Sequence, residues 1–228
     1  MRFLILALCL VFASANAANV EHEVSKLYRA PSCNPLITEL PIFPILAKQN
    51  ASTKHSSVVL IGKNKWATSA HSIFDGEHTS ITIFVGVEKE VQAIPTFVDL
   101  RADVAILRGA SGDIKPVEPL TYDIQKFEQL WNIGFPSITN NELLSFTGMH
   151  VRYNKRGQMV TTALGLNGMS GGATFRCAGE KLEYVGVITA LIKDRIDTKV
   201  HTDEDGILVK TITYTNSGIS LISPLRID

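Results

Sequence analysis

The sequence predicts an all-β protein, either a barrel or a sandwich. Short runs rich in β-branched and aromatic residues recur at regular spacing from about Leu40 onward, and glycine, proline, asparagine and aspartate separate them. Long segments with the 3.6-residue period of a helix are few. Many short strands with turn signals between them are typical of antiparallel barrels and sandwiches.

The composition is that of a globular protein without a marked charge. The chain has 228 residues, of which 45% are hydrophobic and 19% charged, and its formal net charge is zero. This length fits one domain, or two small half-domains that share a core. A neutral chain offers no basic surface for nucleic acid or for an anionic membrane, so we expect neither as a partner.

The expected strands follow the apolar runs. They cover residues 57–62, 81–87, 90–98, 104–108, 130–134, 143–148, 159–162, 183–188, 206–210 and 218–222. Short helices are expected at 70–74 and 123–129, and a long exposed hairpin or loop at 193–214. We expect Trp66 and Trp131 in the core, and His150 and His201 on the surface.

The first 17 residues have the pattern of a cleaved secretory signal. Met1-Arg2 is a short positive start, residues 3–12 are apolar, and small residues follow in an A-x-A pattern that predicts cleavage after Ala17. The alternative is a transmembrane anchor, but an apolar run of this length spans only about half of a bilayer core. Residues 18–40 are polar and predict an extended N-terminal arm.

Signal removal would leave two cysteines, Cys33 and Cys177. An exported chain could join them in a disulfide that ties the arm to the second half of the domain. The alternative is one buried and one exposed thiol, and the sequence does not decide between them. Neither cysteine has the spacing of a zinc site and the histidines are scattered, so no metal site is expected.

Three segments carry residues suited to acyl-transfer chemistry. Trp66 to His71 is an apolar strand that runs into small residues and a histidine, and Asp103 stands directly before the apolar run 104–107. Asn167 to Gly172 places Ser170 among glycines. Each segment alone is common in proteins without catalysis, as a turn, a surface histidine or a strand cap. Their joint appearance in the order His, Asp, Ser within a β-rich exported chain predicts a catalytic triad.

The expected roles follow from the chemistry of each group. Ser170 would be the nucleophile, and His71 the general base that takes its proton and returns it to the leaving amine. Asp103 would hold the imidazole in one tautomer and stabilise the imidazolium. The backbone amides of Gly168 and Ser170 would form an oxyanion hole, each worth about 3–4 kcal/mol in the transition state.

The three segments together resemble the motifs of trypsin-like serine proteases. Thr68-Ser69-Ala70-His71 is similar to T-A-A-H, Asp103-Val104-Ala105-Ile106-Leu107 to D-[IV]-A-[LIV]-L, and Gly168-Met169-Ser170-Gly171-Gly172 to G-[DN]-S-G-G. The triad residues are 32 and 67 positions apart. This compact spacing is similar to that of bacterial glutamyl endopeptidases and of the protease domain of periplasmic heat-shock serine proteases.

The resemblance implies two antiparallel six-stranded β-barrels with the active site in the cleft between them. It covers about residues 41–228, with one barrel at about 41–118 and the other at about 119–228. It also places Leu164 on the floor of the substrate (P1) pocket and Ile188 and Leu191 on its wall, which predicts an uncharged P1 residue. Thr189 falls where the family has a small hydroxyl residue that supports the catalytic aspartate.

One position departs from the family pattern. Met169 stands where many members have an aspartate or asparagine before the nucleophile. The digestive enzymes use that aspartate to bind a new N-terminus after zymogen cleavage, which methionine cannot do. Activation by that ion pair is therefore excluded, and whether the arm must be trimmed is open.

The leading hypothesis is a secreted or periplasmic serine endopeptidase that needs no cofactor, is a monomer and acts on a protein or peptide. A second hypothesis is a catalytically silent member of the same fold that binds a peptide or a partner. An esterase is a third, but esterases of the G-x-S-x-G type place histidine last in the chain, whereas here it comes first.

Overall fold

The computed structural model describes residues 39–225, except 74–78, 87, 121–122, 138–141, 180 and 203–207. The chain divides into two compact units, Met1–Ser32 and Cys33–Asp228, and all the described residues belong to the second. The predicted signal segment 1–17 and nearly all of the predicted arm 18–40 lie outside the described residues.

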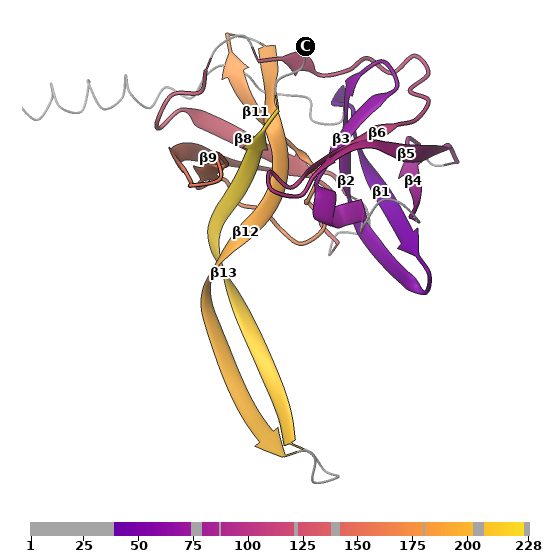
Figure 1. The fold of residues 1–228 in the computed structure, drawn as a ribbon. Coiled ribbons are helices and arrows are strands. Elements are labelled where there is room, and N and C mark those ends of the chain that lie inside the picture. The colour runs from indigo at the N-terminus through magenta and orange to yellow at the C-terminus, as the bar shows by residue number, and fades with distance from the viewer. Residues whose placement is uncertain are drawn as a thin grey trace, which may run out of the picture. The chain divides into compact units, whose positions relative to one another are not determined.

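The described chain is built almost entirely of β-strands (Figure 1). In chain order they are β1 (Ile42–Gln49), β2 (Ser52–Gly62), β3 (Lys65–Thr68), β4 (Ser80–Phe84), β5 (Glu90–Asp99), β6 (Val104–Arg108), β7 (Glu118–Pro119), β8 (Gln129–Gly134), β9 (Leu144–Tyr153), β10 (Met159–Thr161), β11 (Ala173–Ala178), β12 (Lys181–Thr202) and β13 (Leu208–Pro224). A single turn of 3₁₀ helix, η2 (Ala70–Ile73), follows β3. No helix in this part of the chain is long and apolar enough to cross a membrane.

The strands form two closed antiparallel barrels of six strands each. The first has the order β1-β2-β3-β6-β5-β4, and β1 closes it by pairing with both β2 and β4. The second has the order β11-β8-β9-β10-β13-β12, closed by the β11–β12 pairing, and β7 adds to it in parallel beside β12. The predicted double-barrel fold is thereby confirmed, while the cleft between the barrels stays a prediction.

Three apolar clusters account for the packing. One fills the first barrel around Trp66, Leu60 and Leu107, and another fills the second around Leu130, Met159 and Ile222. A third joins strands of both barrels, with Val59 and Ile106 from the first packed in the same cluster as Phe175 and Tyr184 from the second. Because this shared cluster is buried, the two barrels are fixed against each other by apolar contacts.

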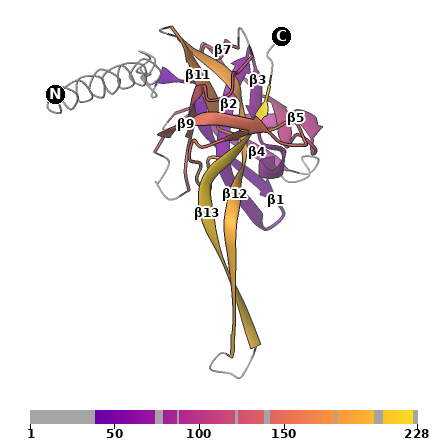
Figure 2. The same ribbon diagram turned by 90° about the vertical axis from the view of Figure 1, so that its left-hand side faces the viewer.

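Two of the expected elements differ in the structure. The described part of the first segment, 208–210, and the segment 218–222 belong to one long strand, β13, which pairs with β12 from Gly186↔Pro224 to Thr202↔Leu208. Beyond Leu191 and Ser220 the described parts of β12 and β13 pair only with each other, as a long two-stranded hairpin (Figures 1 and 2). The long hairpin was predicted, but its extent was underestimated.

The short helix expected at 123–129 was wrong. This segment contains a turn in which Phe127 has a left-handed backbone, with φ of 67°, that a right-handed helix does not allow. The Glu128 carboxylate accepts a hydrogen bond from the amide of Gln125 at 2.7 Å, and β8 begins at the next residue, Gln129. The hydrogen bond to the Glu128 side chain and the start of β8 at the next residue leave no room for the backbone hydrogen bonds of a helix.

His150 was expected on the surface and is buried, with 3% of its area exposed. It lies on β9, where its backbone exchanges hydrogen bonds with Phe127 and Glu128, and its ring lies 4.8 Å from that of Tyr153. Among the described residues its Nδ1 has no hydrogen-bond partner. Burial lowers the pKa of His150 from its ordinary value of 6.5, although a hydrogen bond with the Val160 backbone and the nearby charge of Glu128 oppose the shift.

Acid is therefore expected to destabilise the protein in part through His150. Below pH 6.5 the unfolded chain binds a proton at this residue more readily than the folded chain does, so the free energy of unfolding falls as the pH falls. Urea denaturation at pH 7.5 and pH 5.0 should show a smaller acid-induced loss for His150→Phe than for the unsubstituted protein. Equal losses in both proteins would mean that His150 does not sense pH.

Candidate active site

His71 and Asp103 lie at the neighbouring ends of two paired strands. β3 pairs with β6 through Thr68↔Ala105, so η2 after β3 and the turn before β6 emerge at the same edge of the first barrel. The backbone fixes this approach, because the Ala70 amide donates to the Asp103 carbonyl at 3.2 Å. Asp103 has a left-handed backbone with φ of 58°, which aspartate tolerates better than most residues.

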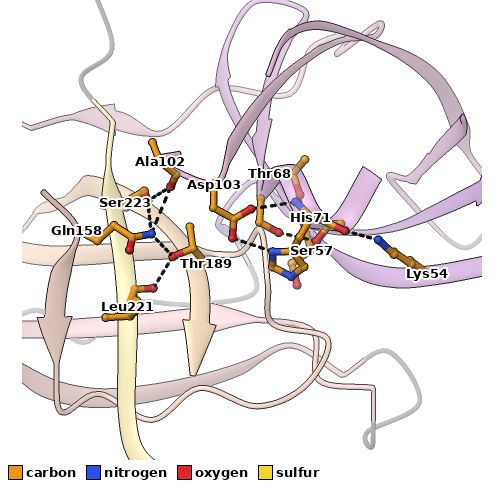
Figure 3. Close-up of polar contacts among 12 residues, drawn as sticks. Lys54, Ser57, Thr68, His71, Ala102, Asp103, Gln158, Thr189, Leu221 and Ser223 are labelled. Atoms are coloured by element: carbon orange, nitrogen blue, oxygen red, sulfur yellow. Dashed lines mark hydrogen bonds and ion pairs between the residues drawn. The ribbon is translucent and has the colours of Figure 1, made fainter. Parts of the chain in front are cut away.

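The Asp103 carboxylate holds His71 by two hydrogen bonds (Figure 3). Its Oδ1 accepts from the His71 amide at 2.9 Å, and its Oδ2 lies 2.8 Å from Nδ1 of the ring. Since a carboxylate only accepts hydrogen bonds, Nδ1 carries the hydrogen and Nε2 is left to accept a proton. The His71 side chain is half exposed, so the ring is open to solvent on one side.

A second set of buried polar groups supports the peptide that leads into Asp103 (Figure 3). The Ala102 carbonyl accepts hydrogen bonds from the Ser223 hydroxyl and, at 3.4 Å, from Nε2 of Gln158. The same Gln158 amide lies 3.2 Å from the Thr189 hydroxyl, which donates to the Leu221 carbonyl at 3.1 Å. Strands of the second barrel thus position the residue next to Asp103.

Ser170 lies in a turn held on two sides. Its carbonyl accepts a hydrogen bond from the amide of Ser57 on β2 at 2.8 Å, and the next amide, of Gly171, donates to the Ile188 carbonyl on β12 at 2.7 Å. The Thr68 hydroxyl at the end of β3 donates to the Ser57 carbonyl at 2.7 Å. The turn is therefore tied to the strand that leads, three residues later, into His71.

The glycines of this turn are required by its backbone. Gly168 has φ of 93° and Gly171 has φ of 81°, values that favour glycine. The Gly168 carbonyl is turned toward Ser57, whose hydroxyl donates to it at 3.0 Å and accepts from the amide of Phe135 at 2.9 Å. Within the described residues, the amides of Gly168 and Ser170 have no hydrogen-bond acceptor, which is the state required of an oxyanion hole.

Two of the three predicted triad residues, His71 and Asp103, are hydrogen-bonded to each other. The turn that carries the third, Ser170, is tied through Ser57 to the end of β3, just before His71. Within the described part of the chain, the Ser170 hydroxyl makes no hydrogen bond to His71. Met169, the departure from the family pattern, is fully buried in the apolar cluster of the second barrel. There it anchors the turn by packing.

The predicted P1 residues have different surroundings. Leu164 is half-buried, whereas Ile188 is 2% exposed and packs in the core of the second barrel. Thr189 is also buried and is linked to the peptide before Asp103 through Gln158 and Ala102. The backbone of Leu191 pairs with Ser220, and its side chain lies outside the described part of the structure.

Sequence reasoning missed three residues of this site. Ser57 ties β2 to the Ser170 turn, Gln158 supports the Asp103 peptide, and Lys54 donates through Nζ to the His71 carbonyl. Their partners are between 17 and 111 positions away in the chain. No local motif marks such contacts, so the sequence carried no signal for them.

Cys177 forms a disulfide bond, and its partner lies outside the described residues. Pairing with Cys33 stays a prediction. Within the described part of the chain, no group of three or more His, Cys, Asp or Glu side chains could hold a metal ion.

Gly171→Ala is expected to disrupt the site. A methyl group there would lie 2.1 Å from both the Ser57 carbonyl oxygen and the Thr68 hydroxyl, on a backbone already disfavoured for alanine. We expect the unfolding free energy to fall by more than the roughly 1–2 kcal/mol that left-handed backbone alone costs an L-residue. Gly157→Ala is the matched control, since Gly157 has φ of 77° and nothing within 4 Å of the added methyl. Equal losses in urea denaturation would show that the turn has room to relax.

The comparison with solved structures supports the fold. No protein-family model matches the sequence, and no curated protein matches it. Among solved structures, the chain is similar to the serine endoprotease from Yersinia pestis, with a TM-score of 0.62 and 17% sequence identity. The match covers 85% of this chain and 64% of that one, so this chain corresponds to less than two thirds of that protein. Together with the two closed barrels, this likeness shows that the chain has the fold of trypsin-like serine proteases.

Proposed function

We propose that the protein is a secreted serine endopeptidase that uses His71, Asp103 and Ser170. The observation that carries the proposal is the pair of hydrogen bonds that the Asp103 carboxylate accepts from the amide and the ring of His71. This arrangement leaves Nε2 as a base at the edge of the barrel where the Ser170 turn is tied.

The proposed reaction proceeds in two halves. Nε2 of His71 takes the Ser170 proton as Oγ bonds to the carbonyl carbon of the peptide, and the oxyanion forms between the amides of Gly168 and Ser170. The intermediate then breaks its C–N bond, the amine leaves with the proton from Nε2, and the acyl group stays on Oγ. Water repeats the sequence with His71 as base, which releases the carboxylic acid and restores the serine.

The fold supports peptides as the substrate class. The similar Yersinia pestis protein is a serine endoprotease, and the motif order His, Asp, Ser is the same as in that class of fold. A catalytically silent relative that only binds peptides is the competing outcome of the test. It predicts binding without product.

Hydrolysis of an unfolded protein substrate tests the proposal. The purified protein should produce new peptides, identified by mass spectrometry, whereas Ser170→Ala should produce none under the same conditions. Peptide binding by both proteins without cleavage would favour the silent relative.

Secretion has a separate test. Expression of the full chain in a bacterium should give an exported protein whose N-terminal sequence begins at Ala18, after signal cleavage. Recovery of the chain with Met1 intact in the cytoplasm would contradict this part of the proposal.

A further inference from the structure

Asn167-Gly168 is the one place in the chain where an asparagine is followed directly by a glycine. The backbone nitrogen of the residue after an asparagine can attack the Cγ carbon of the asparagine side chain, which closes a succinimide ring. A glycine in that position favours the attack, because it has no Cβ to hinder the approach of its nitrogen. The dipeptide lies in the Ser170 turn, where the Gly168 amide is a predicted donor of the oxyanion hole.

The Asn167 side chain is available for this reaction. Asn167 is exposed, and within the described residues its carboxamide makes no hydrogen bond. The Asn154 carboxamide, in contrast, accepts hydrogen bonds from the backbone amides two and four residues later, at 2.8 and 3.0 Å. Asn50 is exposed in the turn between β1 and β2, but Ala51 with its Cβ follows it. Of these three asparagines, Asn167 alone combines an exposed, unbonded carboxamide with a glycine neighbour.

The fold also activates the attacking nitrogen. The Asn167 carbonyl and the Gly168 amide belong to one peptide group. The carbonyl accepts a hydrogen bond from the Ser137 amide at 2.8 Å, whereas the Gly168 amide has no acceptor among the described residues. The Ser137 bond draws electron density toward the carbonyl oxygen, because hydrogen bonds in a chain polarise one another. The Gly168 N–H therefore gives up its proton to a base more readily, and the deprotonated nitrogen is the form that attacks.

The backbone around the dipeptide forms a turn. The Met169 amide donates to the Leu166 carbonyl at 3.0 Å, so Asn167 and Gly168 are the two central residues of this turn. Neither of them belongs to a strand. The Gly168 nitrogen can therefore change its partner without the loss of a hydrogen bond between strands.

The reaction needs only water and a base from solution. The Gly168 nitrogen loses its proton to the base and bonds to Cγ of Asn167, and the Cγ–Nδ2 bond breaks as ammonia leaves with a proton from water. A second water then opens the ring by adding its hydroxyl to a ring carbonyl, while its remaining proton returns to the ring nitrogen. Opening at Cγ gives aspartate, whereas opening at the former backbone carbonyl gives isoaspartate, in which the main chain runs through Cγ.

Either product places a carboxylate one residue before the predicted oxyanion donor. Under the proposed function, a negative charge there opposes the oxyanion that forms in the transition state. Isoaspartate also lengthens the backbone by one carbon atom in a turn that is already crowded, since a methyl group on Gly168 would lie 2.4 Å from the Ser137 amide nitrogen. The longer backbone would displace the Gly168 carbonyl from the Ser57 hydroxyl, which donates to it at 3.0 Å.

We propose that Asn167-Gly168 is a site of spontaneous modification, at which Asn167 is converted through a succinimide into isoaspartate or aspartate and the oxyanion hole is lost. The conversion itself depends only on this dipeptide and its surroundings. Its effect on activity rests on the proposed endopeptidase function. The reaction would limit the time for which the protein stays active.

Incubation of the folded protein at pH 8.5 tests the conversion, which is measured by mass spectrometry of its peptides and by an isoaspartate-specific methyltransferase. We expect Asn167 to be converted about tenfold faster than Asn50, because glycine leaves the attacking nitrogen accessible. At pH 6.0 the conversion should be slower, since less of the Gly168 amide is deprotonated. Asn167→Gln is the matched variant, because its longer side chain must close a larger ring, and it should show no conversion at this position.

The kcat for peptide hydrolysis is followed in the same samples. It should fall in proportion to the conversion, with the isoaspartate form about 100-fold less active than the fresh protein, as expected for loss of one oxyanion donor. Asn167→Gln should keep its own starting kcat throughout the incubation. Asn167→Asp carries the charge without the additional backbone carbon, so its kcat should lie between those of the fresh protein and of the isoaspartate form.

Conversion that occurs in the urea-unfolded chain but not in the folded protein would overturn the inference, because the fold would then protect the dipeptide. Complete conversion with an unchanged kcat would overturn the loss of the oxyanion hole. The two proposals can fail separately. If the fresh protein hydrolyses no peptide, the endopeptidase proposal fails, but conversion of Asn167 in the folded chain still supports the modification site.

Discussion

Asp103→Asn is expected to lower kcat/KM for peptide hydrolysis by about 10,000-fold. The asparagine amide can donate a hydrogen bond to Nδ1 of His71, which favours the tautomer with its hydrogen on Nε2. That nitrogen then cannot accept the Ser170 proton. Because asparagine has nearly the same shape as aspartate, the loss should appear in kcat with the fold intact, as measured by steady-state kinetics and circular dichroism.

Asp99→Asn is the matched control for this substitution. Asp99 Oδ1 accepts from the amides of Arg101 and Ala102 at 2.8 and 2.9 Å, in the turn that leads into Asp103. An asparagine oxygen can make the same two bonds, so activity should change by about twofold or less. If Asp103→Asn kept more than a tenth of the activity, Asp103 would have no role in setting the tautomer.

Arg176→Met is expected to lower the free energy of unfolding by about 3–5 kcal/mol. Arg176 is completely buried on β11, where its guanidinium binds the Glu183 carboxylate through Nε at 2.8 Å and through Nη2. Glu128 approaches Nη1 at 3.4 Å. Removing the arginine leaves the buried Glu183 carboxylate without its counter-charge, and urea denaturation at pH 7.5 should record the loss.

Two further variants separate the charge effect from the loss of volume. Arg176→Met/Glu183→Leu removes both charges and should recover most of the stability, because a buried ion pair replaced by apolar side chains is often neutral. Tyr184→Phe removes a neighbouring buried hydroxyl that, among the described residues, has no partner, so it should not destabilise. A double variant as unstable as Arg176→Met would show that the arginine stem, rather than its charge, carries the effect.

The same arginine shows why part of the fold could not be predicted from the sequence. Strands with an uninterrupted apolar or alternating run, such as β6 and β8, were predicted to within one residue. β11 was missed, because its sequence ATFRCA contains a charge that is typical of the surface. β1 was missed as well, since Pro44 interrupts its apolar run. In both strands, tertiary contacts override the local pattern.

The residues of the site also divide into those that the sequence predicts and those that it does not. His71, Asp103 and Ser170 each stand in a short local motif, so the sequence alone suggested them. Gln158 and Ser57 reach their partners across 56 and 111 positions, and only the pairing of distant strands brings them there. The burial of Ile188, likewise, depends on the closure of the second barrel. Such residues are found only after the strand order is known.

Labelling with a fluorophosphonate probe tests the central claim most directly, because the probe reacts with a serine only when a neighbouring base activates it. The unsubstituted protein, Ser170→Ala and His71→Ala would be compared under the same conditions, with circular dichroism to confirm that each is folded. We predict labelling of the unsubstituted protein at Ser170 and its loss in both variants. Absence of labelling in the folded, unsubstituted protein, before and after removal of residues 18–40, would contradict the endopeptidase account.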